Sequence, residues 1–224
     1  MKTGCRNPVL VLATVFACVC ISLDAEPARS GNSPGNETRL SKDEVRSLLV
    51  PISFDMPSKT EMSNMNRIVE YGPRVLPILA ELLSEPGAQA DLVNRILVVA
   101  SRIEGDKRAI VMRLPALLEN SDRRIRIDTI KALHKWGSAN DCQYLLPLVT
   151  AGEESVRIHA LRALGALGDL NTAEALQGSL AKWKSQVPLE RRNTDSTLKY
   201  GHMALSNIVQ RSTCARSDSQ GVPK

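Results

Sequence analysis

The sequence predicts an all-α protein, an α-α superhelix in which about four helical hairpins stack as a solenoid. Leucine, isoleucine, valine and alanine supply most of the apolar residues, whereas aromatic residues make up only 3% of the 224-residue chain. This composition favours close-packed helices over a sheet. Apolar residues also recur at helical spacing, and the helix caps, helix stops and core positions repeat together along the chain.

An N-terminal leader is predicted over residues 1–25. Lys2 and Arg6 precede an apolar run from Pro8 to Ile21, which is the order of regions in a signal peptide. The run is shorter than the roughly 20 residues that a permanent membrane-spanning helix needs. We therefore expect export and cleavage, giving a secreted or periplasmic mature protein without stable membrane insertion.

Two features of the leader leave its processing open. Cleavage after Ala25 and cleavage after Ser22 both place small or apolar residues at the recognition positions. A lipid anchor at Cys18 is an alternative, but the bulky Phe16 fits a lipobox poorly, so a soluble mature protein is favoured.

The rest of the chain divides by composition into a linker, a repeat domain and a tail. Residues 26–40 are rich in Gly, Pro, Ser and Asn and lack an apolar period, which predicts a flexible linker. Helical patterns then fill residues 41–212, the predicted repeat domain. Residues 213–224 are polar and are predicted to form a disordered tail.

Helix boundaries are marked by caps and glycines. Predicted capping boxes, each with an acidic residue three positions after the cap, are Ser41–Glu44, Ser58–Glu61, Ser138–Asp141 and Asn171–Glu174. Glycines that follow apolar-periodic stretches are expected to end helices in the left-handed conformation, at Gly72, Gly105, Gly137 and Gly168. Prolines inside helical patterns are expected to bend their helices, at Pro77, Pro115 and Pro147.

An internal repeat supports this arrangement. A shift of 31 residues superposes Ile125-Arg126-Ile127 on Val156-Arg157-Ile158 and Gly137 on Gly168. With a slip of one residue, Arg95-Ile96 provides a third copy. On this register Arg95, Arg126 and Arg157 occupy the same repeat position. Such repetition is typical of a solenoid, in which each unit contacts mainly its neighbours.

The segment from Glu154 to Asp169 resembles the short HEAT repeat, of the type also found in phycobilisome lyases. Three elements resemble the Leu-Pro-x-Leu element of that family's second helix: residues 76–79, 114–117 and 146–149. The resemblance covers roughly residues 60–183, and the flanking helices are expected to cap the stack. It implies that the repeated arginines contact acidic or carbonyl groups of adjacent repeats, rather than forming a cationic ladder for phosphates or carboxylates.

No catalytic, metal or cofactor site is predicted. The histidines, His134, His159 and His202, lack the spacing of metal ligands. Trp136 and Trp183 end apolar-periodic helices and are expected to fill gaps between repeats.

After leader removal the cysteines are Cys142, on a predicted buried stripe, and Cys214, in the polar tail, which favours two thiols over a bridge. The net charge is +5, or +4 without the charges of the leader, and no basic run is present. Nucleic-acid binding is therefore not expected.

The sequence favours a non-catalytic, exported scaffold or adaptor that binds a protein partner. A lyase or lyase subunit of the bilin-lyase type is the alternative implied by the resemblance, and a nucleic-acid or membrane-surface binder is a third possibility. In HEAT stacks the second helix of each pair usually lines the binding side, and the outward-facing polar residues there are Gln143, Glu174 and Gln177. The sequence predicts neither the identity of the partner nor the oligomeric state.

Overall fold

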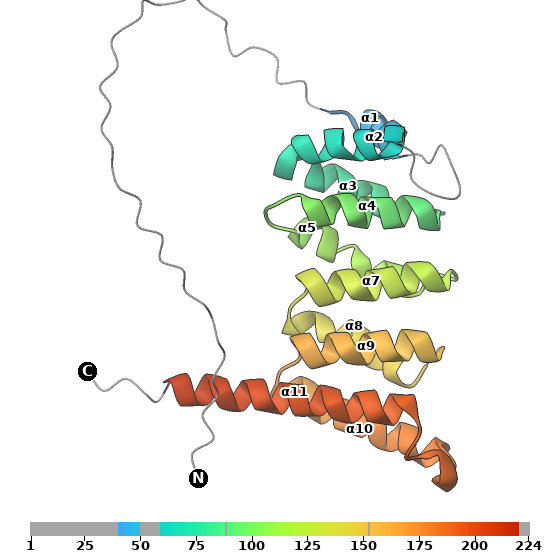
Figure 1. Cartoon of the computed structure of the whole chain (residues 1–224), viewed down its shortest axis with the longest axis vertical. Coiled ribbons are helices and arrows are strands. Elements are labelled where there is room, and N and C mark those ends of the chain that lie inside the picture. Colours follow the sequence, from blue (N-terminus) through green and yellow to red (C-terminus); the bar gives the residue numbers. More distant parts are fainter. Residues whose placement is uncertain (1–39, 50–58, 88, 152, 220–224) are drawn as a thin grey trace, which may run out of the picture. The chain divides into compact units, whose positions relative to one another are not determined.

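The computed structural model describes residues 40–49, 59–87, 89–151 and 153–219, and Figure 1 shows their arrangement. The predicted leader and all but the last residue of the predicted linker lie outside these ranges, so both stay predictions. Every regular element in the described ranges is helical and none is a strand. This confirms the all-α solenoid.

The helices differ widely in length. The longer helices are α1 (Lys42–Leu49), α2 (Lys59–Glu70), α3 (Leu76–Leu83), α4 (Ala90–Arg102), α7 (Arg123–Trp136), α9 (Glu154–Leu167), α10 (Leu170–Gln186) and α11 (Ser196–Ser219). The short ones are η1 (Gly72–Val75), α5 (Arg108–Val111), α6 (Leu114–Leu117), η2 (Ala139–Asp141), α8 (Cys142–Leu145), η3 (Leu146–Val149) and η4 (Leu189–Arg191). Residue 212, the predicted end of the repeat domain, lies inside α11, so the first part of the predicted disordered tail is helical as far as Ser219.

The helices of residues 40–219 form two layers (Figure 1). Layer A contains α2, α4, α7, α9 and α11, each of which packs against the next. Layer B contains α1, α3, α5, α6, α8, η3 and α10. The chain passes back and forth between the layers, so each hairpin contributes one helix to layer A and one helix or pair of short helices to layer B.

The core lies between the two layers. Fully buried side chains come from both, among them Ile96, Leu133 and Leu164 from layer A and Leu79 and Leu145 from layer B. Each such side chain contributes roughly 1.5–3 kcal/mol of burial free energy. Because the buried residues form one cluster along the stack, the repeats stabilise one another.

The 31-residue register is confirmed for two helices. The buried residues of α7 are Ile125, Thr129, Ile130, Ala132 and Leu133, and a shift of 31 residues places each on a buried residue of α9. The third copy is different. Four of the five buried residues of α4, Ile96, Leu97, Val99 and Ala100, fall on buried residues of α7 at a shift of 33 residues, whereas Val93 falls on Ile125 at a shift of 32. Arg95 therefore corresponds to Asp128, and its predicted alignment with Arg126 was wrong.

The predicted caps are confirmed at two positions and wrong at a third. Ser41 and Glu44 exchange backbone and side-chain hydrogen bonds, and Ser138 and Asp141 form the second capping box. Helix α10 starts earlier than predicted, because Asp169 accepts a hydrogen bond from the Thr172 backbone at 2.8 Å. Asn171 is thus inside the helix. Ser58 lies outside the described residues.

The helix-ending glycines have two conformations. Gly72 and Gly105 have φ of 64° and 115°, in the left-handed region as predicted. Gly137 and Gly168 have negative φ and extended ψ, so the prediction was wrong there. The reason for glycine at these two positions is close approach. A Cβ on Gly137 would lie 2.5 Å from the Leu133 carbonyl oxygen, and one on Gly168 would lie 2.7 Å from that of Leu164.

The three prolines break layer B helices rather than bend them. Pro77, Pro115 and Pro147 each occupy the second residue of a helix, in α3, α6 and η3. Proline is tolerated at the first turn, where its missing N–H has no partner in the helix to lose. The expected bend is therefore wrong, and a short helix ends while a new one begins at each of these sites.

Candidate binding surface

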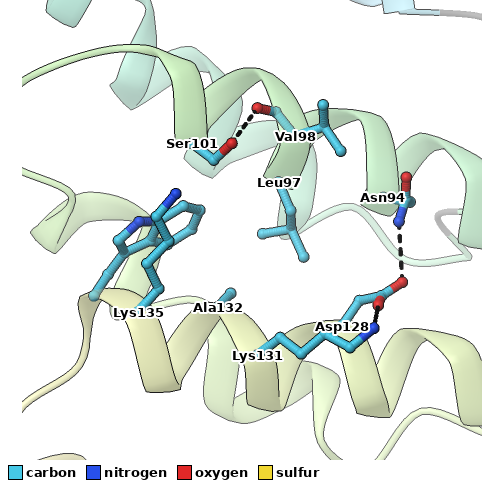
Figure 2. A pocket seen from close by; sticks show the side chains of 9 residues that line it. Asn94, Leu97, Val98, Ser101, Asp128, Lys131, Ala132 and Lys135 are labelled. Carbon is cyan, nitrogen blue, oxygen red and sulfur yellow. Dashed lines mark hydrogen bonds and ion pairs between the residues drawn. The ribbon is translucent and has the colours of Figure 1, made fainter.

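A shallow groove lies between α4 and α7 on layer A. It has a volume of about 190 Å³, and Figure 2 shows its lining side chains. Residues from α4 are Asn94, Leu97, Val98 and Ser101, and those from α7 are Asp128, Lys131, Ala132, Lys135 and Trp136. Two neighbouring helices of the same layer therefore form this groove.

The floor of the groove is apolar. Leu97 and Ala132 are almost fully buried, with 7% and 6% of their surface exposed, whereas Val98 keeps 40% exposed. Trp136 is half-buried at the end of α7 and is counted among the side chains packed on the core. It was predicted to fill a gap between repeats, and it also presents part of its ring system to the groove.

One end of the groove is closed by a polar bridge between the two helices. Asn94 Nδ2 donates a hydrogen bond to Asp128 Oδ2 at 3.0 Å, and Lys131 Nζ lies 2.9 Å from Asp128 Oδ1. Each carboxylate oxygen of Asp128 therefore contacts one of the side chains of Asn94 and Lys131 (Figure 2). This contact pairs Lys131 with a carboxylate, while 60% of the Lys131 side chain stays exposed.

The other end of the groove is more basic. Lys135 forms no ion pair within the described part of the chain, and Lys107 donates hydrogen bonds to the carbonyls of Ile103 and Gly105 just beyond α4. Burial lowers the pKa of Lys107 and the charge of Lys135 lowers it further, whereas the carboxylates of Glu104 and Asp106 raise it. Of these charged groups, Lys135 is the one that lines the groove.

Positive charge also extends from the groove toward α9. His159 is half-buried on that helix, and its pKa is lowered by burial and then by Lys131 and Arg162, against a smaller opposing effect of Asp128. Arg162 itself lies over the Tyr200 ring, 4.9 Å from its centroid. Lys131 and Arg162 are thus the cations that act on His159 at this side of the groove.

Arg95 belongs to the interior of layer A. Its Nη2 lies 2.9 Å from Glu61 Oε1, and the side chains of Arg95 and Glu61 are only 13% and 1% exposed. This ion pair joins α4 to α2 of the preceding repeat. A buried carboxylate needs such a partner, because an unpaired buried charge is strongly destabilising.

Arg126 and Arg157 also contact neighbouring repeats. Arg126 donates to two carbonyls of the preceding loop and lies 3.3 Å from Glu153. Arg157 donates to Thr197 Oγ1 at 3.1 Å and lies over the Trp183 ring at 4.3 Å. The implied contacts with acidic and carbonyl groups are confirmed for Arg95 and Arg126. For Arg157 the contacts described are with a hydroxyl and an aromatic ring.

The residues predicted to contact a partner lie on layer B. Gln143 is on α8, while Glu174 and Gln177 are on α10, and all three are exposed. None of them lines the groove. Their role stays a prediction. Sequence reasoning did not find the groove, although an exposed valine next to Leu97 on α4 is a signal that could have indicated it.

Reactive groups of the described chain are dispersed. Cys142 is buried and forms no disulfide, and burial raises the pKa of its thiol. No group of three or more His, Cys, Asp or Glu among the described residues is placed to hold a metal ion. None of the helices described here is both long and apolar enough to cross a membrane.

Comparison with protein families gives one match. Residues 104–188 match HEAT repeats. The matched segment starts just before α5 and ends after α10, so it contains the two helices with the 31-residue register, α7 and α9. The chain matches no curated protein. HEAT repeats commonly act as protein-interaction scaffolds, and the groove borders the matched segment on α7.

Proposed function

We propose that this chain is an exported, non-catalytic scaffold or adaptor that binds a protein partner through layer A. The observation that carries the proposal is the groove between α4 and α7, where Val98 and Trp136 offer apolar surface to solvent between charged ends. Apolar centres with polar edges are the usual anatomy of a protein-binding patch. HEAT repeats add support, since they commonly mediate protein interactions, although a fold alone does not set a function.

The layer B surface is the second candidate for the partner site. Gln143, Glu174 and Gln177 are exposed there, and Tyr144 beside Gln143 is 42% exposed. Tyrosine is enriched at interfaces because one end is apolar and the other can hydrogen-bond. A single experiment distinguishes the two surfaces.

Site-specific photo-crosslinking provides that experiment. A photoreactive residue would replace Val98 in the groove or Gln177 on α10, and the full chain would be exposed to the extracytoplasmic fraction of its own host. We expect a crosslinked protein at Val98, because that side chain lies at the groove, and none at Gln177. Crosslinking of the same protein only at Gln177 would move the site to layer B. The absence of any specific crosslinked protein at either position would contradict a scaffold function.

Export is a separate part of the proposal and rests on Lys2, Arg6 and the apolar run that follows them. Intact-mass measurement of the protein recovered outside the cytoplasm tests it. We expect a mature species that begins after Ser22 or after Ala25. A species that still carries residues 1–20 would contradict the predicted leader.

A bilin-lyase role is the alternative. Its test is the visible absorbance of the protein purified from its host, because a bound bilin absorbs visible light whereas the side chains of this chain do not. We expect no visible band. A band that co-purifies with the folded chain would favour the lyase.

A further inference from the structure

We infer that the partner segment held in the groove is an acidic peptide, which places one apolar side chain on the floor and a carboxylate beside Lys135. The inference rests on the proposed function, because it specifies the chemistry of the partner at the same site. It follows from the size of the floor, from the charges at the two ends and from the position of Asp128.

The floor has the size of one large apolar side chain. An apolar cavity of about 150 Å³ holds a benzene ring, and the groove has a volume of about 190 Å³. Leu97 and Ala132 form its base, and Val98 and Trp136 form its sides. A leucine or aromatic side chain placed here would remove the exposed part of Val98 and Trp136 from water. This is the burial that anchors a peptide at a hot spot.

The charges at the two ends of the groove are unequal. Asp128 pairs with Lys131 at one end, whereas Lys135 forms no ion pair within the residues described. Lys107 lies outside the lining of the groove, donates to two backbone carbonyls and has the carboxylates of Glu104 and Asp106 close enough to shift its pKa. A carboxylate at this end would therefore pair with Lys135, and a peptide with an acidic residue there would be favoured.

The same features disfavour other polyanions. Asp128 in the wall of the groove is paired with Lys131, so that end offers no unpaired cation to a phosphate backbone that followed α4 and α7 from end to end. Nucleic-acid binding usually needs a longer basic track and several stacking aromatics, whereas Trp136 is the aromatic residue lining this groove. An anionic membrane would likewise find an unpaired cation at one end of the groove only. A peptide can place its acidic residues at one end only.

Selection of peptides on the full chain tests the inference. A random peptide library on phage would be selected on the wild-type chain, and the enriched peptides would be synthesised and measured against Lys135→Glu and Lys182→Glu variants. Lys182 is an exposed lysine of α10 in layer B and supplies the matched charge reversal. Thermal melting would establish that both variants are folded.

We expect enriched peptides that contain an apolar residue flanked by Asp or Glu. Lys135→Glu should weaken their binding about tenfold, and Lys182→Glu should not change it. Their binding should also weaken as salt is raised. Enrichment of peptides without acidic residues, equal binding to both variants, or no enrichment at all would overturn the inference.

Two further probes separate this inference from its competitors. Single-stranded RNA and vesicles containing phosphatidylserine would be measured against the same variants. Binding of either probe that depends on Lys135, without binding of acidic peptides, would assign the groove to that class of ligand and overturn the inference. The proposed function is tested independently by the crosslinks at Val98 and Gln177, so a crosslinked partner whose contact segment lacks acidic residues would leave the scaffold intact and contradict only the acidic peptide.

Discussion

Every hairpin contributes to both layer A and layer B, yet the helices of the two layers differ in length. In layer A, α7 and α9 each run uninterrupted for 14 residues. In layer B, the segments opposite α7 and α9 contain pieces of four residues, such as α6, α8 and η3. Proline at the start of α6 and η3 accounts for the breaks. Layer A therefore provides a continuous helical surface. Layer B is divided into shorter helices that pack against it.

The short helices of layer B depend on burial rather than on intrinsic helix stability. An isolated helix shorter than about 12 residues is marginal in water, so four-residue helices need tertiary packing. Leu117, Leu145 and Val149 provide it, since each is at most 8% exposed. We infer that layer A organises the stack and that layer B folds onto it.

The largest effect is expected at Leu164, which is fully buried in α9. Leu164→Asp places a charge between helices, and we expect a loss of about 4 kcal/mol or more of unfolding free energy, or failure to fold. Ala166→Asp, two residues later on the exposed side of α9, should change stability little. Denaturant titration measures both. Similar stability for wild type and Leu164→Asp would contradict the register of layer A.

The next effect concerns the ion pair that joins α2 and α4. Glu61→Ala leaves Arg95 without this carboxylate, and we expect a loss of roughly 3–5 kcal/mol. The double variant Glu61→Met with Arg95→Met should regain most of that stability, because buried pairs can be replaced by apolar residues of similar size. Arg123→Ala, which removes an exposed pair with Glu153, should have an effect below about 1 kcal/mol. If Glu61→Ala is equally mild, the pair does not stabilise layer A.

Proline should be tolerated differently by the two layers. Lys131 lies in the middle of α7, and Lys131→Pro should be less stable than Lys131→Ala by about 3 kcal/mol because a helix hydrogen bond is lost. Pro147→Ala at the start of η3 should change stability by less than about 1 kcal/mol. Thermal melting of the three variants gives the comparison. Equal stability of Lys131→Pro and Lys131→Ala would contradict the difference between the two layers.

The smallest effect is a pH dependence at His159. Burial and the charges of Lys131 and Arg162 lower its pKa below the usual value of 6.5. The unfolded chain therefore takes up this proton first, and stability is lost as the pH falls below 6.5 and through the folded pKa. His159→Gln should flatten this part of the stability profile. If His159→Gln loses the same stability at acidic pH as the wild type, His159 is not the group responsible.

The sequence predicted layer A better than layer B, for physical reasons. Apolar spacing indicates which residues of an uninterrupted helix are buried, so the register of Ile125 with Val156 could be predicted. A proline inside an apolar pattern is compatible with a bend or a break, and Pro147 alone does not decide between them. Whether the helix bends or breaks depends on how its side chains are buried against the facing layer, which is a property of the fold.

The register of the third repeat was predicted wrongly, and the groove was not predicted, for a related reason. The sequence alone aligns Arg95 with Arg126, because both are arginines before an isoleucine. The pattern of buried residues instead aligns Arg95 with Asp128. The groove needs side chains from both α4 and α7, so it could not be predicted from either helix alone.

Hydrogen exchange most directly tests the claim that layer A carries the partner site. The exchange of backbone amides would be measured in the full chain with and without the protein captured at Val98, or with an enriched peptide. We predict slower exchange in α4 and α7 and unchanged exchange in α8 and α10. Slower exchange confined to α8 and α10, around Gln143, Glu174 and Gln177, would contradict the account and place the partner on layer B.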